Sequence, residues 1–127
     1  MPDIKNKKPS DALYDMSLEE IINISNKIGL EYVEVKKQAE RGELLRLSKR
    51  AEIMNRIERE LKDEGSVGEA KLKRLAEADS EYIELLESIS KLRAKAETLR
   101  IRYESYKNLF DAKKIMFSLK KAEITNL

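Results

Sequence analysis

The chain has 127 residues, the length of one domain, and its 26 lysines and arginines nearly balance 24 aspartates and glutamates. It contains no cysteine and no histidine, which excludes disulfides, thiolate metal sites and histidine acid–base catalysis. With only four glycines and two prolines, the composition is typical of long helices. No apolar run approaches the roughly 18 residues of a membrane span. We therefore expect a cytoplasmic, all-α protein that is not an enzyme and has no metal or cofactor.

The first part of the chain is predicted to be a tail followed by a long helix. Residues 1–16 combine three lysines, three aspartates and both prolines, a composition that favours a flexible tail. Ser17 and Glu20 then precede a run of isoleucines, which is the pattern of a capping box. A helix is expected over about 18–62, within an N-terminal helical segment at 17–64.

Apolar residues along this helix predict its buried face. Gly29 and Gly42 each disfavour a helix interior by about 1 kcal/mol relative to alanine, so a break at one of them is an alternative. The first apolar stripe comprises Ile28, Tyr32, Val35 and Ala39. Beyond Gly42 the stripe is expected to restart as Leu44, Leu47, Ala51, Met54 and Leu61.

The strongest break in the chain lies at Gly65 and Gly68, which open a segment at 65–79. Ser66 with Glu69 resembles a second capping box, and it predicts a loop followed by a short helix. This helix either continues beyond residue 79 or gives way to a new one.

A long helix is predicted over residues 80–127 by an uninterrupted apolar seam with 3–4 spacing, the pattern of a coiled coil. The seam consists of Tyr82, Leu85, Ile89, Leu92, Ala96, Leu99, Tyr103, Tyr106 and Phe110. Such a helix is roughly 60 Å long, whereas a compact chain of this size has a radius of gyration near 14 Å. We therefore expect an elongated helical hairpin or bundle that forms homo-oligomers, with a ring as one option, through these nine residues.

Basic residues before and after the loop are candidates for binding nucleic acid. Residues 36–62 contain nine basic and five acidic side chains, and lysine and arginine bind phosphates. The candidate DNA-binding residues are Arg46, Lys49, Arg50, Arg56, Arg59, Lys62, Lys71, Lys73 and Arg74. An ordinary solvated face explains the middle segment equally well. In the last helix, Glu97, Glu104 and Asp111 recur beside the basic residues, so ion pairs within that helix are expected.

The order of three motifs resembles a known family. Ile57-Glu58-Arg59-Glu60-Leu61-Lys62 precedes a glycine-containing loop, Leu75-Ala76-Glu77-Ala78-Asp79 ends the short helix, and Asp111-Ala112-Lys113-Lys114 lies in the long one. Over about 18–121 the chain resembles the UvsY-type recombination mediators of T-even and related phages. The resemblance implies single-stranded DNA binding by the N-terminal part and ring assembly through the C-terminal helix. It also implies a RecA-like recombinase and the single-strand-binding protein as partners, with no catalytic residue or cofactor.

Two functions follow from these observations. The first is a non-enzymatic mediator that binds single-stranded DNA as an oligomer and helps to load a RecA-like recombinase during DNA recombination and repair in a phage-infected host. The alternative is a protein-only coiled-coil adaptor, an assembly chaperone or an inhibitor of a host protein. The near-neutral net charge of +2 and the interleaved acids favour this alternative.

Overall fold

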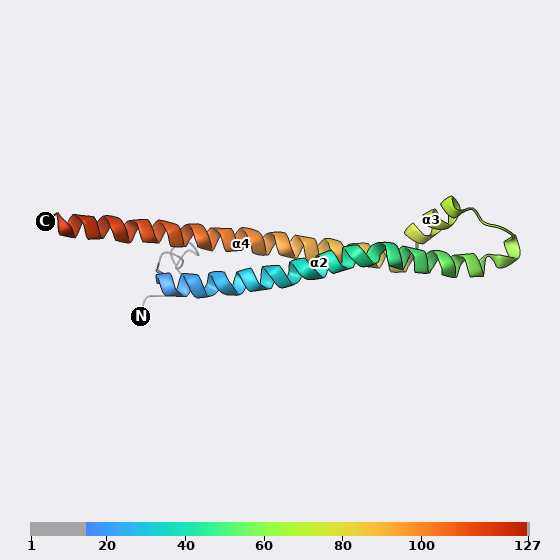
Figure 1. The fold of residues 1–127 in the computed structure, drawn as a ribbon, viewed down its shortest axis with the longest axis horizontal. Coiled ribbons are helices and arrows are strands. Elements are labelled where there is room, and N and C mark those ends of the chain that lie inside the picture. The colour runs from blue at the N-terminus through green and yellow to red at the C-terminus, as the bar shows by residue number, and fades with distance from the viewer. Residues whose placement is uncertain (1–14, 127) are drawn as a thin grey trace, which may run out of the picture. The chain divides into compact units, whose positions relative to one another are not determined.

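The computed structural model describes residues 15–126 of the chain, so all but the last two residues of the tail predicted at residues 1–16 lie outside the described part. The described residues form the helices α2 (Leu18–Glu60), α3 (Glu69–Glu77) and α4 (Ser80–Thr125), with one turn of 3-10 helix, η2 (Lys62–Glu64), after α2 (Figure 1). They contain no strand, and α4 packs against α2. The all-α prediction is confirmed.

The helices contribute to two compact units. Among the described residues, the terminal unit comprises 15–32 and 98–126, and the central unit comprises 33–97. Helices α2 and α4 each run through both units, whereas α3 belongs to the central unit alone.

The start of α2 is the predicted one. The Glu20 N–H donates to Ser17 Oγ at 3.1 Å, and the Ile21 N–H donates to the Ser17 carbonyl at 3.0 Å. Ser17 is therefore the N-cap of the helix. The helix continues through both of its glycines and ends at Glu60, two residues before the predicted end. Gly65 follows with φ of 87°, a left-handed conformation that favours glycine.

The second predicted capping box is wrong. Gly68, and not Ser66, is the N-cap of α3, and no side chain caps this helix. Helix α3 ends before Asp79, which begins the next helix. The Glu81 N–H donates to Asp79 Oδ1 at 3.0 Å, and the Ile83 N–H donates to the Asp79 carbonyl at 3.0 Å. Asp79 is therefore the N-cap of α4.

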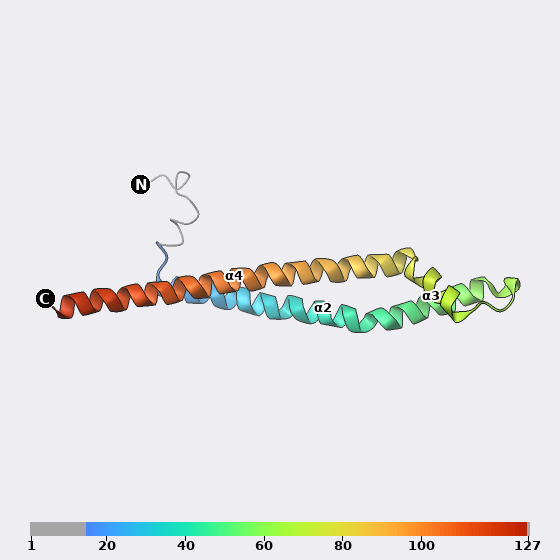
Figure 2. The ribbon, with the colours of Figure 1, turned by 90° about the horizontal axis from the view of Figure 1, so that it is seen from above.

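In the terminal unit, an apolar interface joins α2 and α4. Ile21 and Ile28 of α2 are buried with Leu99 of α4. A Cβ placed on Gly29 would lie 3.4 Å from the Tyr103 ring, so the two helices are in close contact there. Near the start of α2, Lys113 Nζ donates to the Met16 carbonyl. The two helices therefore run antiparallel within this unit (Figures 1 and 2).

In the central unit, the apolar core lies where α3 meets the other two helices (Figure 2). The cluster of buried residues consists of Ile53, Ile57, Leu72, Ala76 and Tyr82. Burying a large aliphatic side chain contributes about 1.5–3 kcal/mol, so this cluster fixes α3 against α2 and the start of α4.

The predicted α4 seam faces α2 within a single chain. Tyr82, Ile89, Ala96 and Leu99 are buried, Leu85, Leu92, Tyr106 and Phe110 are partly buried, and Tyr103 is 37% exposed. The seam therefore has a long partner helix within the same chain, because α2 has 43 residues. The role of the seam in oligomerisation stays a prediction.

The buried stripe predicted beyond Gly42 is wrong for its first three residues. Leu44 is 81% exposed and Leu47 is 56% exposed, and Ala51 is exposed as well. Met54 and Leu61 are partly buried and pack against the apolar cluster. The α4-facing stripe instead continues in 3–4 steps through Gly42, where an added Cβ would lie 2.9 Å from Ile89 Cγ1. Gly42 therefore occupies a packing position in an unbroken helix. The next stripe positions on this face are Arg46, Lys49 and Ile53.

Candidate nucleic-acid interface

The nine candidate DNA-binding residues lie in three places in the central unit. Arg46, Lys49 and Arg56 are partly buried on the face of α2 that lies opposite Leu44 and Leu47, and Arg50 is partly buried on its flank. Arg59 and Lys62 are exposed at the end of α2, and Lys71, Lys73 and Arg74 are exposed on α3. The contacts of these groups decide which of them can bind phosphate.

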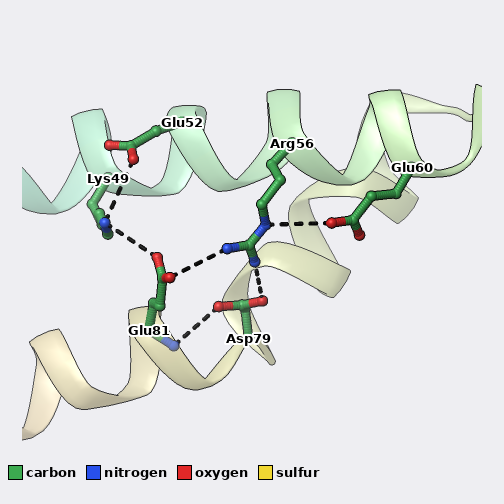
Figure 3. A network of polar contacts seen from close by, with 6 residues as sticks. All are labelled: Lys49, Glu52, Arg56, Glu60, Asp79 and Glu81. Carbon is green, nitrogen blue, oxygen red and sulfur yellow. Dashed lines mark hydrogen bonds and ion pairs between the residues drawn. The ribbon is translucent and has the colours of Figure 1, made fainter.

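Arg56 is the centre of an ion-pair network (Figure 3). Its Nη2 donates to Asp79 Oδ2, its Nη1 lies 3.4 Å from Glu81 Oε1, and its Nε lies 3.8 Å from Glu60 Oε1. The Asp79 side chain is only 20% exposed, and its other oxygen caps α4. Arg56 therefore links α2 to the first turn of α4.

Lys49 belongs to the same network. Its Nζ lies 3.2 Å from Glu81 Oε2 and 3.6 Å from Glu52 Oε1. Glu81 thus uses one oxygen for Lys49 and the other for Arg56 (Figure 3). The hydrogen bond to Glu81 raises the pKa of Lys49, and the charges of Glu52 and Glu81 act in the same direction.

Two further basic residues of α2 also face carboxylates. Arg50 Nη1 donates to Glu77 Oε1 at the end of α3, at 3.2 Å. Arg46 Nε lies 3.2 Å from Glu43 Oε1, and Arg93 of α4 donates to the other oxygen of Glu43 at 2.9 Å. The Arg50–Glu77 pair joins α2 to α3 and the Arg93–Glu43 pair joins α4 to α2, whereas the Arg46–Glu43 pair lies within α2. A phosphate at this face would compete with carboxylates already in contact.

The remaining five basic residues are free of such partners. Arg59, Lys62, Lys71, Lys73 and Arg74 form no ion pair or side-chain hydrogen bond with any residue in the described range. Between residues 58 and 77, however, these five bases accompany six acidic residues. This end of the central unit has basic groups available for contacts but no net positive charge.

Ion pairing within α4 follows the prediction only in part. Arg100 Nη1 donates to Glu104 Oε1 at 2.8 Å, which confirms the expected pair one turn apart. Arg93 instead reaches Glu43 of α2. Basic groups beside the seam therefore contribute to helix packing as well as to the solvent face.

The site that sequence reasoning missed is apolar. We call it the outer leucine face, which consists of Val33, Leu44, Leu47 and Ala51. The exposed fractions of Leu44 and Leu47 are 81% and 56%, and that of Val33 is 48%. The signal that would have found it is the 3–4 spacing from Val35 and Ala39 through Gly42, which turns these leucines outward.

The described residues were also compared with what a metal site and a membrane-spanning helix require. Within residues 15–126, no three histidine, cysteine, aspartate or glutamate side chains are grouped so that they could hold a metal ion. Among the helices in the described part of the chain, none has the length and apolar character needed to cross a membrane.

Comparisons with known proteins identify no relative of this chain. The chain matches no protein-family model, no curated protein and no solved structure. The resemblance to the recombination mediators therefore stays a prediction.

Proposed function

We propose that the chain is a helical adaptor without catalytic activity, which binds protein partners through exposed apolar helix faces. The observation that carries this proposal is the outer leucine face of α2. Monomeric proteins seldom expose adjoining large apolar side chains unless another molecule covers them. Covering the exposed parts of Leu44 and Leu47 would contribute about 3 kcal/mol, given their exposed fractions of 81% and 56%.

Exposed apolar side chains also lie in the terminal unit, on several sides of the end of α4. They are Ile115, Met116, Phe117, Leu119 and Ile124, which are between 50% and 72% exposed. Phe117 and Ile124 continue the 3–4 spacing of the α4 seam beyond the last contact with Met16. They extend the apolar side of α4 past the start of α2, where the described chain offers no further helix turn to cover them.

The ion pairs on the other side of α2 also support a protein-only function. Four of the nine candidate DNA-binding residues already contact carboxylates of α2, α3 or α4. Binding phosphate there would break contacts that join the helices. DNA binding along this face of α2 is thus less favourable than the sequence predicts.

The second candidate is the recombination mediator, which would bind single-stranded DNA and help a RecA-like recombinase. The observation that favours it is the set of five unpaired basic residues around the loop: Arg59, Lys62, Lys71, Lys73 and Arg74. If this function applies, DNA binds at the α3 end of the central unit and not along the middle of α2.

Titration of labelled single-stranded DNA across a salt series, followed by fluorescence anisotropy, separates the two functions. The adaptor should show no saturable binding even at low salt. The mediator should show a slope of log affinity against log salt of about −0.7 for each phosphate contact. In that case Arg59→Ala with Lys62→Ala should make the slope shallower by about 1.4. Arg50→Ala is the matched control, because Glu77 already pairs with this residue.

Saturable DNA binding that disappears with the Arg59 and Lys62 substitutions would overturn the protein-only proposal in favour of the mediator. Binding that depends instead on Arg50 would mean that the DNA breaks the α2–α3 ion pair. The mediator would then bind along the middle of α2, as the sequence predicted.

A further inference from the structure

We propose that a second copy of this chain covers the outer leucine face, and that the two α2 helices pack antiparallel about a two-fold axis near residues 45 and 46. This inference rests on the proposed function, because it names one protein partner and the surface it uses. It leaves the apolar end of α4 in the terminal unit for a different partner.

The spacing of the outer leucine face fits another helix. Val33, Leu44, Leu47 and Ala51 occupy positions of one 3–4 repeat, in which Lys37 and Glu40 fill the two intervening positions. This repeat lies on the side of α2 opposite the one that faces α4. A straight helix with the same repeat can therefore pack along it in the manner of a coiled coil.

The charges beside the leucines select an antiparallel second copy. When Leu44 lies opposite Leu47 of the other copy, Arg41 comes beside Glu52 of that copy along one edge. The two-fold axis repeats the contact, so each dimer contains it twice. Arg41 is exposed and has no ion pair with any residue in the described range, and Glu52 is 71% exposed at its side chain. The surface is therefore complementary to itself.

The other edge of the same register is complementary as well. It brings Glu43 beside Arg50 of the second copy, and both side chains retain exposed area, 36% and 24%. A parallel arrangement would instead set Lys36 against Arg41 of the other copy, which is a repulsive pair. Both edges thus favour the antiparallel arrangement.

The two-fold contact also agrees with how the chain folds by itself. The face of α2 opposite the leucines is already occupied through Gly42, Lys49 and Arg56. Turning α2 to bury the leucines against α4 would break these contacts. A second chain can cover the leucines without any rearrangement, so self-association and the fold of one chain do not compete.

Sedimentation velocity on the full chain tests the surface. The parent should have the mass of two chains at tens of micromolar, and Leu44→Glu with Leu47→Glu should have the mass of one chain. Because both leucines are exposed, the helix content measured by circular dichroism should not change. Ile101→Glu is the matched control: Ile101 is 53% exposed but lies on α4 in the terminal unit, and this variant should keep the mass of two chains.

A parent with the mass of one chain would overturn the proposal and leave this face to a different protein. A dimer that survives the Leu44 and Leu47 substitutions would overturn it too, because the contact would then lie elsewhere, for instance on the α4 seam. Neither outcome depends on DNA binding, so failure of this inference is distinguishable from failure of the adaptor function in the salt series.

A charge exchange tests the orientation. Arg41→Glu and Glu52→Arg should each weaken the dimer about tenfold, since each replaces two attractive contacts by two repulsive ones. The double variant, Arg41→Glu with Glu52→Arg, should recover the parent affinity. Double-variant affinity below that of either single variant would overturn the antiparallel register.

Discussion

The two parts of α2 use opposite kinds of residue to contact α4. In the terminal unit, Ile21 and Ile28 are buried against α4, as in an ordinary amphipathic helix. In the central unit, the residues that face α4 over the middle turns are Gly42, Arg46 and Lys49, while the leucines of the same turns face outward. Over these turns the usual polarity of an amphipathic helix is therefore reversed: the polar side of α2 faces α4, and its apolar side faces outward.

This difference shows that the α2–α4 contact over these middle turns depends on close approach and ion pairs. Gly42 has no side chain and leaves room for Ile89, and Arg56 and Lys49 reach carboxylates at the start of α4. Apolar packing flanks these turns, with Val35 and Ala39 buried before them and the cluster shared with α3 after them. The leucines that would ordinarily form the interface are left for another molecule.

The largest expected effect is on the free energy of unfolding, and it distinguishes a core residue of the central unit from a residue of the outer leucine face. Ile53 is 1% exposed, so Ile53→Ala should reduce the free energy of unfolding by about 2–5 kcal/mol. Leu44→Ala, measured at a concentration low enough to keep the chains single, should change it by less than about 0.5 kcal/mol. Urea unfolding monitored by circular dichroism checks both values. Equal losses would mean that Leu44 is buried within the chain.

The two glycines of α2 should respond in opposite directions to alanine. Gly42→Ala places a Cβ 2.9 Å from Ile89 Cγ1, and relieving this overlap should cost about 1–3 kcal/mol, more than the gain in helix propensity. Gly29→Ala places a Cβ 3.4 Å from Tyr103, so the gain of about 0.5–1 kcal/mol from propensity should dominate. Thermal unfolding of the two variants gives the signs. A stabilised Gly42→Ala would argue against the close approach of α4.

Removing the ion pair between Arg56 and Asp79 should have a smaller effect. In a double-mutant cycle with Arg56→Gln and Asp79→Asn, the coupling free energy should be about 1–2 kcal/mol, because both groups are charged, hydrogen-bonded and partly buried. Arg59→Gln is the control for loss of a positive charge, since Arg59 has no ion pair within the described residues. Additive effects of the two substitutions would contradict the contact.

The smallest expected effect concerns alkaline pH. The pKa of Lys49 in the folded chain is raised above its ordinary value of 10.5. Its contribution to stability is therefore fully present below about pH 10.5 and is lost as the pH rises through the folded pKa. Between about pH 9 and pH 11, the urea midpoint of the parent should fall more than that of Lys49→Met. Identical falls would mean that Lys49 does not contact Glu81.

The helices could be predicted from the sequence because their signals are local. Ser17 caps α2 as expected, and the regular seam from Tyr82 to Phe110 correctly predicts the face of α4 that packs along its length. The cap of α3 could not be predicted, because Ser66 and Glu69 fit the capping pattern while the chain places Gly68 at the helix start.

The central section of α2 could not be predicted from hydrophobicity. A glycine in a helical pattern suggests a break, and a leucine suggests a core residue, yet Gly42 packs inside and Leu44 lies outside. The partners of Lys49 and Arg56 lie 32 and 23 residues further along the chain, at Glu81 and Asp79. These basic side chains contact carboxylates, and not solvent or phosphate, only because α4 lies beside α2.

The measurement that tests the reversed polarity of α2 most directly is disulfide formation between α2 and α4. The chain has no natural cysteine, so engineered pairs report on one contact each. Gly42→Cys with Ile89→Cys should form a disulfide within one chain under mild oxidation, because the added Cβ lies 2.9 Å from Ile89 Cγ1. Leu44→Cys with Ile89→Cys should not, since Leu44 faces away. Efficient cross-linking of the Leu44 pair, with none for the Gly42 pair, would contradict the account and return the leucines to the interface with α4.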